Sequence, residues 1–321
     1  MSGLSKYRMG SFGVTIGILH MLSLIFHLSH YFSYYNSMII ESNVQFQIAS
    51  PAEQKRYLKS LRTKKTSLSV VITGGTRGLG KSMAQTFVEN GDRVFVVSRN
   101  ARDVNAMKKS NPLIYGCTTD VSNPEQVKRM FANVQDAFGR GQDGGIDLFV
   151  NCAALSGGFK RFDEHNEEKI SNIIGTNLTG TAMCCSRAFD VMKTQPQGGA
   201  IYNFLGNGSN GWASPNYSVY GSTKSAIKQL TKSLQREWKG SVVDLHQISP
   251  GLMITDLLME NLSPDTFEYI KALCSTPEHV ARHIVPRMRA TYYSAKDEHT
   301  IKFLTNIKIV YKMFFGALNK P

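Results

Sequence analysis

The chain has 321 residues and a formal net charge of +13, which suits one large α/β domain with extensions. Its five cysteines show neither a CxxC pair nor a Cys/His spacing, so we expect no metal site and no disulfide framework, but buried thiols in a reducing compartment. The basic excess is concentrated in residues 51–65 and 287–321 without a helix-turn-helix, zinc-finger or RNP-like pattern, which argues against nucleic-acid binding and favours an anionic membrane surface.

Residues 1–50 are expected to be a targeting or membrane-anchoring segment. Two basic residues precede an uncharged stretch over 12–28 that continues to residue 32, which is at the lower limit for spanning a bilayer. This order fits an uncleaved signal-anchor, and it also fits a secretory signal peptide, although no Ala-x-Ala-like cleavage site follows. The seven serines and missing acids of residues 1–40 fit an organellar transit peptide. A buried core helix is disfavoured because His20, His27 and His30 would need partners inside.

Residues 51–66 are expected to form a solvated, basic helix and linker, followed by a catalytic domain over 67–321. Near the end of that domain, five apolar side chains fall on one helical face with two lysines beside it. The apolar positions are Ile307, Val310, Tyr311, Phe314 and Leu318, and the lysines are Lys308 and Lys312. The pattern predicts either an interfacial helix on a membrane or a helix packed in the core or in a homo- or hetero-oligomer.

Between these ends, short β-rich runs alternate with helical stretches. We expect strands at 68–73, 93–99, 113–120, 146–153, 200–205 and 242–249, with 301–305 as a candidate last strand. This alternation predicts a doubly wound parallel sheet of the Rossmann type with right-handed crossovers. Ligands bind such sheets at the carboxyl ends of the strands, which is where each of the following motifs falls.

A glycine-rich loop joins the first strand to the next helix. It reads Thr73-Gly74-Gly75-Thr76-Arg77-Gly78-Leu79-Gly80. Gly74 allows a tight turn, Gly78 lets the backbone approach a pyrophosphate, and Gly80 permits close helix packing. Phosphate oxygens would then meet the amides and the positive dipole end of a helix that starts near Leu79. The strand before this loop and the helix after it indicate a dinucleotide site.

The second strand bears on the choice of dinucleotide. It ends Val97-Ser98-Arg99-Asn100, without the acid that binds the ribose 2′-hydroxyl at NAD-specific sites. A guanidinium at Arg99, assisted by Arg77 in the glycine loop, matches a 2′-phosphate in geometry and charge. The alternative is a pair of exposed arginines without a ligand. Because both lie where the adenosine ribose is expected, we predict NADPH as the cofactor.

A tyrosine and a lysine lie one helical turn apart in the segment Tyr220-Gly221-Ser222-Thr223-Lys224. A phenol normally loses its proton near pH 10, so it is a poor acid or base at neutral pH. We expect the ammonium of Lys224 to favour the phenolate and to lower the pKa of Tyr220 toward the working range. Tyr220 is then the candidate general acid for carbonyl reduction.

The glycine loop followed by Tyr-x-x-x-Lys resembles the short-chain dehydrogenase/reductase family over about residues 67–255. The resemblance implies that Lys224 also holds the nicotinamide ribose. It implies that Asn177, in a long helix over 167–192, holds a water in the proton relay. Further implied cofactor contacts are Asp120 and Val121 at the adenine, and Pro250, Gly251 and Thr255 at the carboxamide. Asn151 and Ala153 are also implied contacts, in the segment Asn151-Cys152-Ala153-Ala154, where the family usually has Asn-Asn-Ala-Gly.

The serine of the family departs from its usual position. The family carries an active serine 13 residues before the tyrosine, but position 207 is asparagine here, and the nearest serine is Ser209, 11 residues before Tyr220. Ser209 would reach the substrate carbonyl if the glycine-rich loop bulges. The amide of Asn207 is an alternative donor to an oxyanion.

The segment from Asn203 to Gly211, together with Tyr-Gly-Ser-Thr-Lys, is similar to a plastid branch of this family, the chlorophyll b reductases. The resemblance covers roughly residues 67–315 and implies reduction of the C7 formyl group of chlorophyll b to hydroxymethyl. It also implies a plastid location, at the thylakoid membrane, with the endoplasmic reticulum membrane as the alternative. The rival interpretations are a membrane-anchored reductase of steroids, retinoids or fatty-acyl groups, and a non-catalytic scaffold with the same fold that binds a nucleotide and a partner.

A macrocyclic substrate needs a wide cleft, and two loops are its expected walls. They are residues 155–165, after the fourth strand, and residues 252–289, after the sixth. Both contain apolar side chains able to cover a flat ring. These are Phe159, Phe162, Leu257, Leu258 and Phe267. The alternative is that these side chains pack a lid or a subunit contact.

Overall fold

The computed structural model describes residues 50–139, 144–259, 267, 271, 274–294 and 299–304. The predicted anchor over 12–32 and the amphipathic face over 307–318 lie outside these residues. The sheet and the helices that cover it belong to one compact unit, Lys55–Pro321. Within the described ranges, no helix combines the length and the hydropathy that a membrane span requires.

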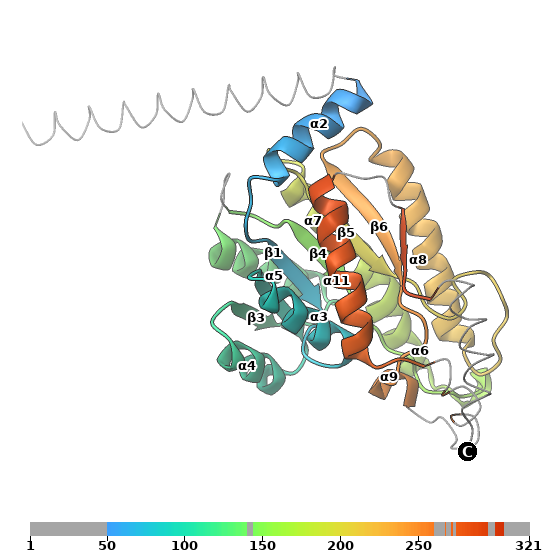
Figure 1. Ribbon diagram of the computed structural model, residues 1–321. Helices are drawn as coiled ribbons and strands as arrows, with labels where there is room; N and C mark the ends of the chain where they lie inside the picture. The colour runs from blue at the N-terminus through green and yellow to red at the C-terminus, as the bar shows by residue number, and fades with distance from the viewer. Residues whose placement is uncertain are drawn as a thin grey trace, which may run out of the picture. The chain divides into compact units, whose positions relative to one another are not determined.

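Seven parallel strands form one sheet in the order β3-β2-β1-β4-β5-β6-β7 (Figure 1). The strands are β1 (Ser69–Thr73), β2 (Arg93–Ser98), β3 (Ile114–Thr118), β4 (Leu148–Asn151), β5 (Gly199–Phe204), β6 (Val243–Ser249) and β7 (Thr300–Lys302). Every residue of β1, β4 and β5 is buried, as expected for strands that are covered on both faces. The order reverses between β1 and β4, and the predicted doubly wound sheet is confirmed.

Helices cover both faces of this sheet. They are α3 (Gly78–Glu89), α4 (Ala101–Ser110), α5 (Pro124–Phe138), α6 (Glu167–Ile174), α7 (Thr181–Met192), α8 (Ser218–Glu237) and α11 (Pro277–Ser294). Two further helices lie at the ends of the strands: α2 (Pro51–Arg62) reaches their amino ends, and α9 (Asp256–Met259) lies at their carboxyl ends. In Figure 1, α3 and α11 lie side by side in front of the sheet. Their apolar faces meet β1 and β4 in a core that includes Ile72, Met83, Val150 and Ile284. On the other face, α5 packs against α7.

The helix expected over 167–192 is divided into three parts. Between α6 and α7, residues Gly175–Gly180 form a π-helical turn. A side chain at Gly180 would approach Cγ2 of Val121 to 2.9 Å, so the glycine lets this turn press against the segment after β3. A π-helical turn within an α-helix frequently marks a functional site, and this one carries Asn177. The expectation of one uninterrupted helix is therefore wrong in this stretch.

The last turn of α2 differs from the expected solvated linker. The helix itself forms, but the side chain of Arg62 is fully buried and pairs with Asp244 at 2.6 Å. Its guanidinium also donates to the carbonyl oxygens of Gln197, Tyr292 and Val242, at 3.1, 3.2 and 3.2 Å. The physical reason is that carbonyls at the amino ends of β5 and β6 are buried and need donors. One arginine supplies several of them.

A second buried carboxylate ties the same end of the sheet together. Asp147, just before β4, accepts hydrogen bonds from Lys65 Nζ, the backbone N–H of Ser69 and the hydroxyl of Tyr292, at 2.8, 2.8 and 2.7 Å. The ring of Tyr292 in turn lies 4.5 Å from the guanidinium carbon of Arg62. A continuous polar network therefore holds the amino ends of the strands together. The glycine loop lies at the opposite, carboxyl ends.

Candidate active site

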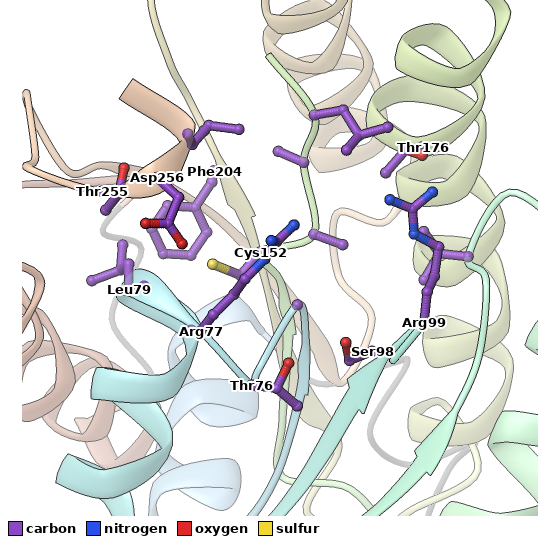
Figure 2. A pocket seen from close by; sticks show the side chains of 18 of the residues that line it. Thr76, Arg77, Leu79, Ser98, Arg99, Cys152, Thr176, Phe204, Thr255 and Asp256 are labelled. Carbon is purple, nitrogen blue, oxygen red and sulfur yellow. The ribbon is translucent and has the colours of Figure 1, made fainter. Parts of the chain in front are cut away.

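A cavity of about 410 Å³ opens at the carboxyl ends of the strands (Figure 2). Most of the predicted cofactor contacts line it, together with both residues of the Tyr-x-x-x-Lys motif. These lining residues are Gly74, Thr76, Arg77, Gly78, Leu79, Gly80, Ser98, Arg99, Val121, Ala153, Tyr220, Lys224, Pro250 and Thr255. The structure does not bring Thr73, Asp120, Asn151, Asn177, Ser209 or Gly251 to the wall of this cavity.

The glycine loop has the geometry of an anion cradle. Gly74 and Gly78 have φ of 68° and 51°, which favours glycine. A Cβ on Gly80 would lie 2.1 Å from the carbonyl oxygen of Gly74, so no side chain fits there. Helix α3 begins at Gly78, and its N-cap residue Arg77 makes no side-chain capping bond. The first amides of α3 therefore suit phosphate oxygens.

Two arginines line the cavity at the predicted position of an adenosine ribose. Figure 2 shows Arg77 and Arg99 reaching into the cavity from the start of α3 and the end of β2. Both also line an adjoining hollow of about 390 Å³, with Ser98, Asn100 and Asp103. The side chain of Asn100 caps α4 by accepting from the N–H of Arg102 at 2.9 Å, which fixes the floor of this hollow. Within the described part of the chain, neither guanidinium has a hydrogen-bonding partner.

Tyr220 and Lys224 lie on the first turns of α8 and are 9% and 4% exposed. Lys224 Nζ donates to the carbonyl oxygen of Phe204 at 3.1 Å and lies 5.6 Å from the centre of the Tyr220 ring. Burial raises the pKa of Tyr220, with smaller contributions from Tyr217 and Cys152. The expected lowering of the Tyr220 pKa is therefore wrong for the protein alone, because burial disfavours the charged phenolate.

Burial lowers the pKa of Lys224 to about 8. At neutral pH the site thus holds a protonated phenol beside an ammonium group. A protonated phenol is the state that a proton donor requires, so the arrangement suits the reduction of a carbonyl. The ammonium can stabilise the phenolate that forms when the proton leaves.

Gly206 takes the place beside the Tyr220 hydroxyl. A Cβ at this position would lie 2.5 Å from Tyr220 Oη and 3.2 Å from Lys224 Cγ. Only glycine leaves room for a substrate oxygen to approach the phenol. Sequence reasoning missed this residue. The sequence feature that could have identified Gly206 is its position two residues after the end of β5, in the loop that leads to α8.

Ser209 and Asn207 are both engaged in the loop after β5. The hydroxyl of Ser209 accepts the N–H of Gly206 at 2.9 Å, and its own N–H donates to the carbonyl of Gly206 at 3.1 Å. Gly208, with φ of 87°, permits the tight return. Asn207 Oδ1 accepts the hydroxyl of Ser214 at 2.9 Å. The loop turns back on itself at Gly208, but the side chains of Ser209 and Asn207 do not line the cavity.

Asn177 connects the π-helical turn that carries it to the loop after β4 and to the first turns of α8. Its Oδ1 accepts the N–H of Leu155 at 2.8 Å, and its Nδ2 donates to the carbonyl of Leu155 and to Thr223 Oγ1, at 2.9 and 3.1 Å. The Thr223 hydroxyl donates to the carbonyl of Tyr220 at 2.7 Å. Asn177 thus positions both the loop after β4 and the turn of α8 that carries the tyrosine. That it holds a water remains a prediction.

The other predicted contacts that stay outside the cavity support its walls. Thr73 Oγ1 accepts the N–H groups of Cys152 and Ala153 at 3.1 and 3.2 Å. Asn151 Nδ2 donates to Asn203 Oδ1 at 2.8 Å. Asp120 accepts the N–H and the hydroxyl of Ser122 at 2.9 and 2.6 Å. Gly251, with φ of 77°, turns against the side chain of Leu304.

The predicted substrate walls are only partly in place, and several lining residues were not predicted. Of the five apolar wall residues, Leu257 lines the cavity, Phe159 packs on Tyr217 with ring centres 5.4 Å apart, and Phe162 is 61% exposed. Leu258 and Phe267 are half-buried. Leu155, Met253 and Asp256 line the cavity from within the two predicted wall loops, and Cys152 and Ala154 line it from the segment matched to the family's Asn-Asn-Ala-Gly. The lining residues that were not predicted are Val97, Thr119, Lys169, Thr176, Phe204 and Leu205. Val97, Thr119, Phe204 and Leu205 stand at or next to the end of a strand, which is a signal that the sequence offers, whereas Lys169 and Thr176 lie on α6 and on the π-helical turn.

Comparison with known proteins places the sequence among reductases. The family profile described as short chain dehydrogenase matches residues 68–265. A probable chloroplastic chlorophyll(ide) b reductase of Oryza sativa subsp. japonica is 37% identical over 263 residues, covering 75% of this chain and 51% of that protein. A chloroplastic chlorophyll(ide) b reductase of Arabidopsis thaliana is 32% identical over 288 residues, covering 86% of this chain and 81% of that protein. The chain spans about half the length of the first of these relatives.

Solved structures share the fold at lower identity. A serine dehydrogenase in complex with NADP+ superposes with a TM-score of 0.63 at 22% identity, covering 74% of this chain and 95% of that one. A 3-ketoacyl-(acyl-carrier-protein) reductase from Brucella melitensis in complex with NADH gives a TM-score of 0.66 at 19% identity, covering 75% and 98%. These likenesses concern the fold alone.

Proposed function

Because the chain belongs to the short-chain dehydrogenase family, we propose that this NAD(P)H-dependent oxidoreductase reduces the C7 formyl group of chlorophyll b or chlorophyllide b to hydroxymethyl, with NADPH as cofactor. One observation carries the proposal. A single cavity joins the glycine loop to the buried Tyr220–Lys224 pair, in a chain 32% identical to a chlorophyll(ide) b reductase over 86% of its length.

The residues present fit a dinucleotide. The first amides of α3 and the glycine loop would hold the pyrophosphate, Arg77 and Arg99 the 2′-phosphate, and Lys224 the nicotinamide ribose. When bound, NADPH supplies the hydride that the formyl carbon accepts. Tyr220 gives its proton to the carbonyl oxygen, so that hydride and proton together complete the alcohol. Lys224 stabilises the phenolate until a proton returns from solvent.

A second donor would hold the substrate carbonyl, and we assign that role to Ser209, with Asn207 as the alternative. The Ser209 hydroxyl already accepts the N–H of Gly206, the residue that adjoins the Tyr220 hydroxyl. A hydroxyl that accepts one hydrogen bond still has a hydrogen to donate. Its hydrogen has no acceptor among the described residues, but the side chain does not line the cavity, so the proposed role requires the loop to shift when the substrate binds.

The chain is also proposed to work in a plastid, at the thylakoid membrane. The pigment is apolar, and the exposed basic side chains of residues 51–65, such as Arg56 and Lys59, suit an anionic membrane surface. Residues 1–50 would supply the targeting or attachment. The relatives named above carry the description chloroplastic, which supports the plastid location.

NADPH preference is expected to depend on Arg99. Arg99→Ala should lower kcat/KM for NADPH on the order of 10- to 100-fold, as for a lost hydrogen bond to a charged group, and leave the value for NADH nearly unchanged. Steady-state kinetics with each nucleotide measures both. Arg102→Ala is the matched control, because Arg102 is exposed on α4 and lines neither hollow. A kcat/KM for NADH equal to or above that for NADPH in the unmodified protein would contradict the assignment.

The proposed function is tested with purified protein, NADPH and chlorophyllide b. We expect the absorption bands of the b pigment to give way to those of the hydroxymethyl product, with consumption of NADPH. Retinal, steroid ketones and short acetoacetyl esters serve as competing carbonyl substrates and should react little. Rapid reduction of one of these compounds, with both b pigments left unchanged, would overturn the proposed function.

A further inference from the structure

Large apolar side chains are exposed mainly at one end of the molecule. The described residues contain six such exposed side chains. Four of them, which we call the apolar rim, lie in the stretches 152–166, 205–217 and 250–259, which directly follow β4, β5 and β6. The apolar rim consists of Phe162, Trp212, Ile254 and Met259, exposed by 61%, 78%, 41% and 40%. These segments also contribute residues to the wall of the catalytic cavity, so the rim belongs to the same end of the sheet.

Trp212 is the most exposed of these side chains, and its loop belongs to the catalytic site. The loop begins at Leu205, which lines the cavity, and ends at Tyr217, whose ring contacts that of Tyr220 edge-on with centres 5.4 Å apart. Residues 205–217 contain no charged side chain. An indole that is 78% exposed contributes little to the stability of the fold, and a large apolar side chain exposed on a loop of the site suits a binding surface.

The loop is held in place rather than loosely attached. The N–H of Trp212 donates to Asn210 Oδ1 at 3.2 Å, and Ser214 Oγ donates to Asn207 Oδ1 at 2.9 Å. The N–H of Lys160 donates to the carbonyl of Asn216 at 3.2 Å, which joins this loop to the loop after β4. The indole is thus presented to solvent from a braced loop, as pre-organised recognition requires.

The size of the cavity limits what it can enclose. Its volume of about 410 Å³ is lined from Arg99 at the adenosine end to Tyr220 at the reacting end. Pockets for a single drug-sized ligand span roughly 300–1,000 Å³, so a dinucleotide takes up most of this one. Beside it, only the reacting edge of a substrate fits. The body of a large flat substrate must therefore lie outside, over the loops that carry the apolar rim.

We propose that Trp212 is a specificity-determining residue that stacks on the face of the pigment macrocycle, while the rest of the apolar rim covers its periphery. This inference rests on the proposed function. An uncharged loop suits an uncharged ring system, and the indole offers a flat surface at low conformational cost. Trp212 and the apolar rim would therefore favour large planar carbonyl compounds over small ones that the cavity alone would accept.

The test compares Trp212→Ala, Trp212→Phe and the control Tyr57→Ala, which removes an exposed aromatic from α2. For Trp212→Ala we expect KM and Kd for chlorophyllide b to rise about tenfold, because the loss of one aromatic contact changes a dissociation constant by about a factor of ten. For Trp212→Phe, which keeps an aromatic ring, both constants should stay within roughly threefold of the unmodified values. The kcat should change little, and reduction of benzaldehyde should be unchanged in all three variants. Pigment fluorescence gives Kd without turnover.

Equal Kd and KM for the pigment in Trp212→Ala and in the unmodified protein would overturn the inference while the proposed function stands. An unmodified protein that neither binds nor reduces the pigment would remove both. A third outcome assigns the rim to a bilayer instead. In that case Trp212→Ala loses binding to phosphatidylcholine vesicles but keeps its KM for detergent-dispersed pigment, and the inference is again overturned.

Discussion

Tyr220→Phe is expected to lower kcat for pigment reduction by about 10²- to 10⁴-fold, the usual contribution of a positioned general acid. The substitution keeps the buried ring and its edge contact with Tyr217 and removes the proton. Because burial raises the pKa of this phenol, the group is protonated at neutral pH, and its hydroxyl lies beside Gly206 in a cavity that Lys224 also lines. Single-turnover kinetics measures the chemical step directly.

The affinity of Tyr220→Phe for NADPH shows whether the substitution removes only the proton donor or also disrupts the nucleotide-binding site. NADPH binding to Tyr220→Phe, followed by the fluorescence of the nucleotide, should stay within about threefold of the unmodified value, since a single neutral hydrogen bond is worth little net free energy. Tyr115→Phe on β3 is the matched control and should keep full activity. Near-normal turnover in Tyr220→Phe would show that another group supplies the proton.

Replacement of Arg62 is expected to have the largest effect on stability. Arg62→Leu should lower the free energy of unfolding by about 3–5 kcal/mol, as for one partner removed from a buried ion pair. The change leaves Asp244 without its cation and the carbonyls of Gln197 and Val242 without a donor. Urea unfolding, monitored by circular dichroism, gives the change in midpoint and slope.

The exposed Arg56 on the same helix supplies the control. Arg56→Leu removes an equal charge from α2 and should shift the midpoint very little. The folded fraction of Arg62→Leu should retain its kcat, because Arg62 bonds to the amino ends of β5 and β6 and the cavity lies at their carboxyl ends. Similar midpoints for the two variants would mean that the buried network adds no net stability.

The sheet could be predicted because its signal is local. Each strand is a short apolar run bounded by polar or turn residues, and the expected strands overlap all of those observed, with ends that differ by up to three residues. The glycine loop was predictable for a similar reason, since the positive φ of Gly74 and Gly78 suits the residue type that stands there. Strand periodicity, however, does not say which side chain at a strand end faces the cavity, and Asn151 turns to Asn203 instead.

The unpredicted features depend on partners far away in the chain. Arg62 reads as part of a basic, solvated linker because its partner Asp244 is 182 residues away. The rise in the Tyr220 pKa reflects burial, which a motif cannot report. Gly206 was overlooked because counting back from Tyr220 points to position 207, whereas the strand ends at Phe204 and brings position 206 to the hydroxyl. Tertiary placement decides each of these three points.

The most direct test of the central claim follows the hydride itself. The purified protein is given chlorophyllide b and NADPH that carries deuterium at the transferable position of the nicotinamide, and the product is examined by mass spectrometry and NMR. Reduction at the formyl group predicts a single deuterium on the new hydroxymethyl carbon, and no labelled product from Tyr220→Phe within the same reaction time. A pigment that stays unlabelled, or that carries deuterium at any other carbon, would contradict the account.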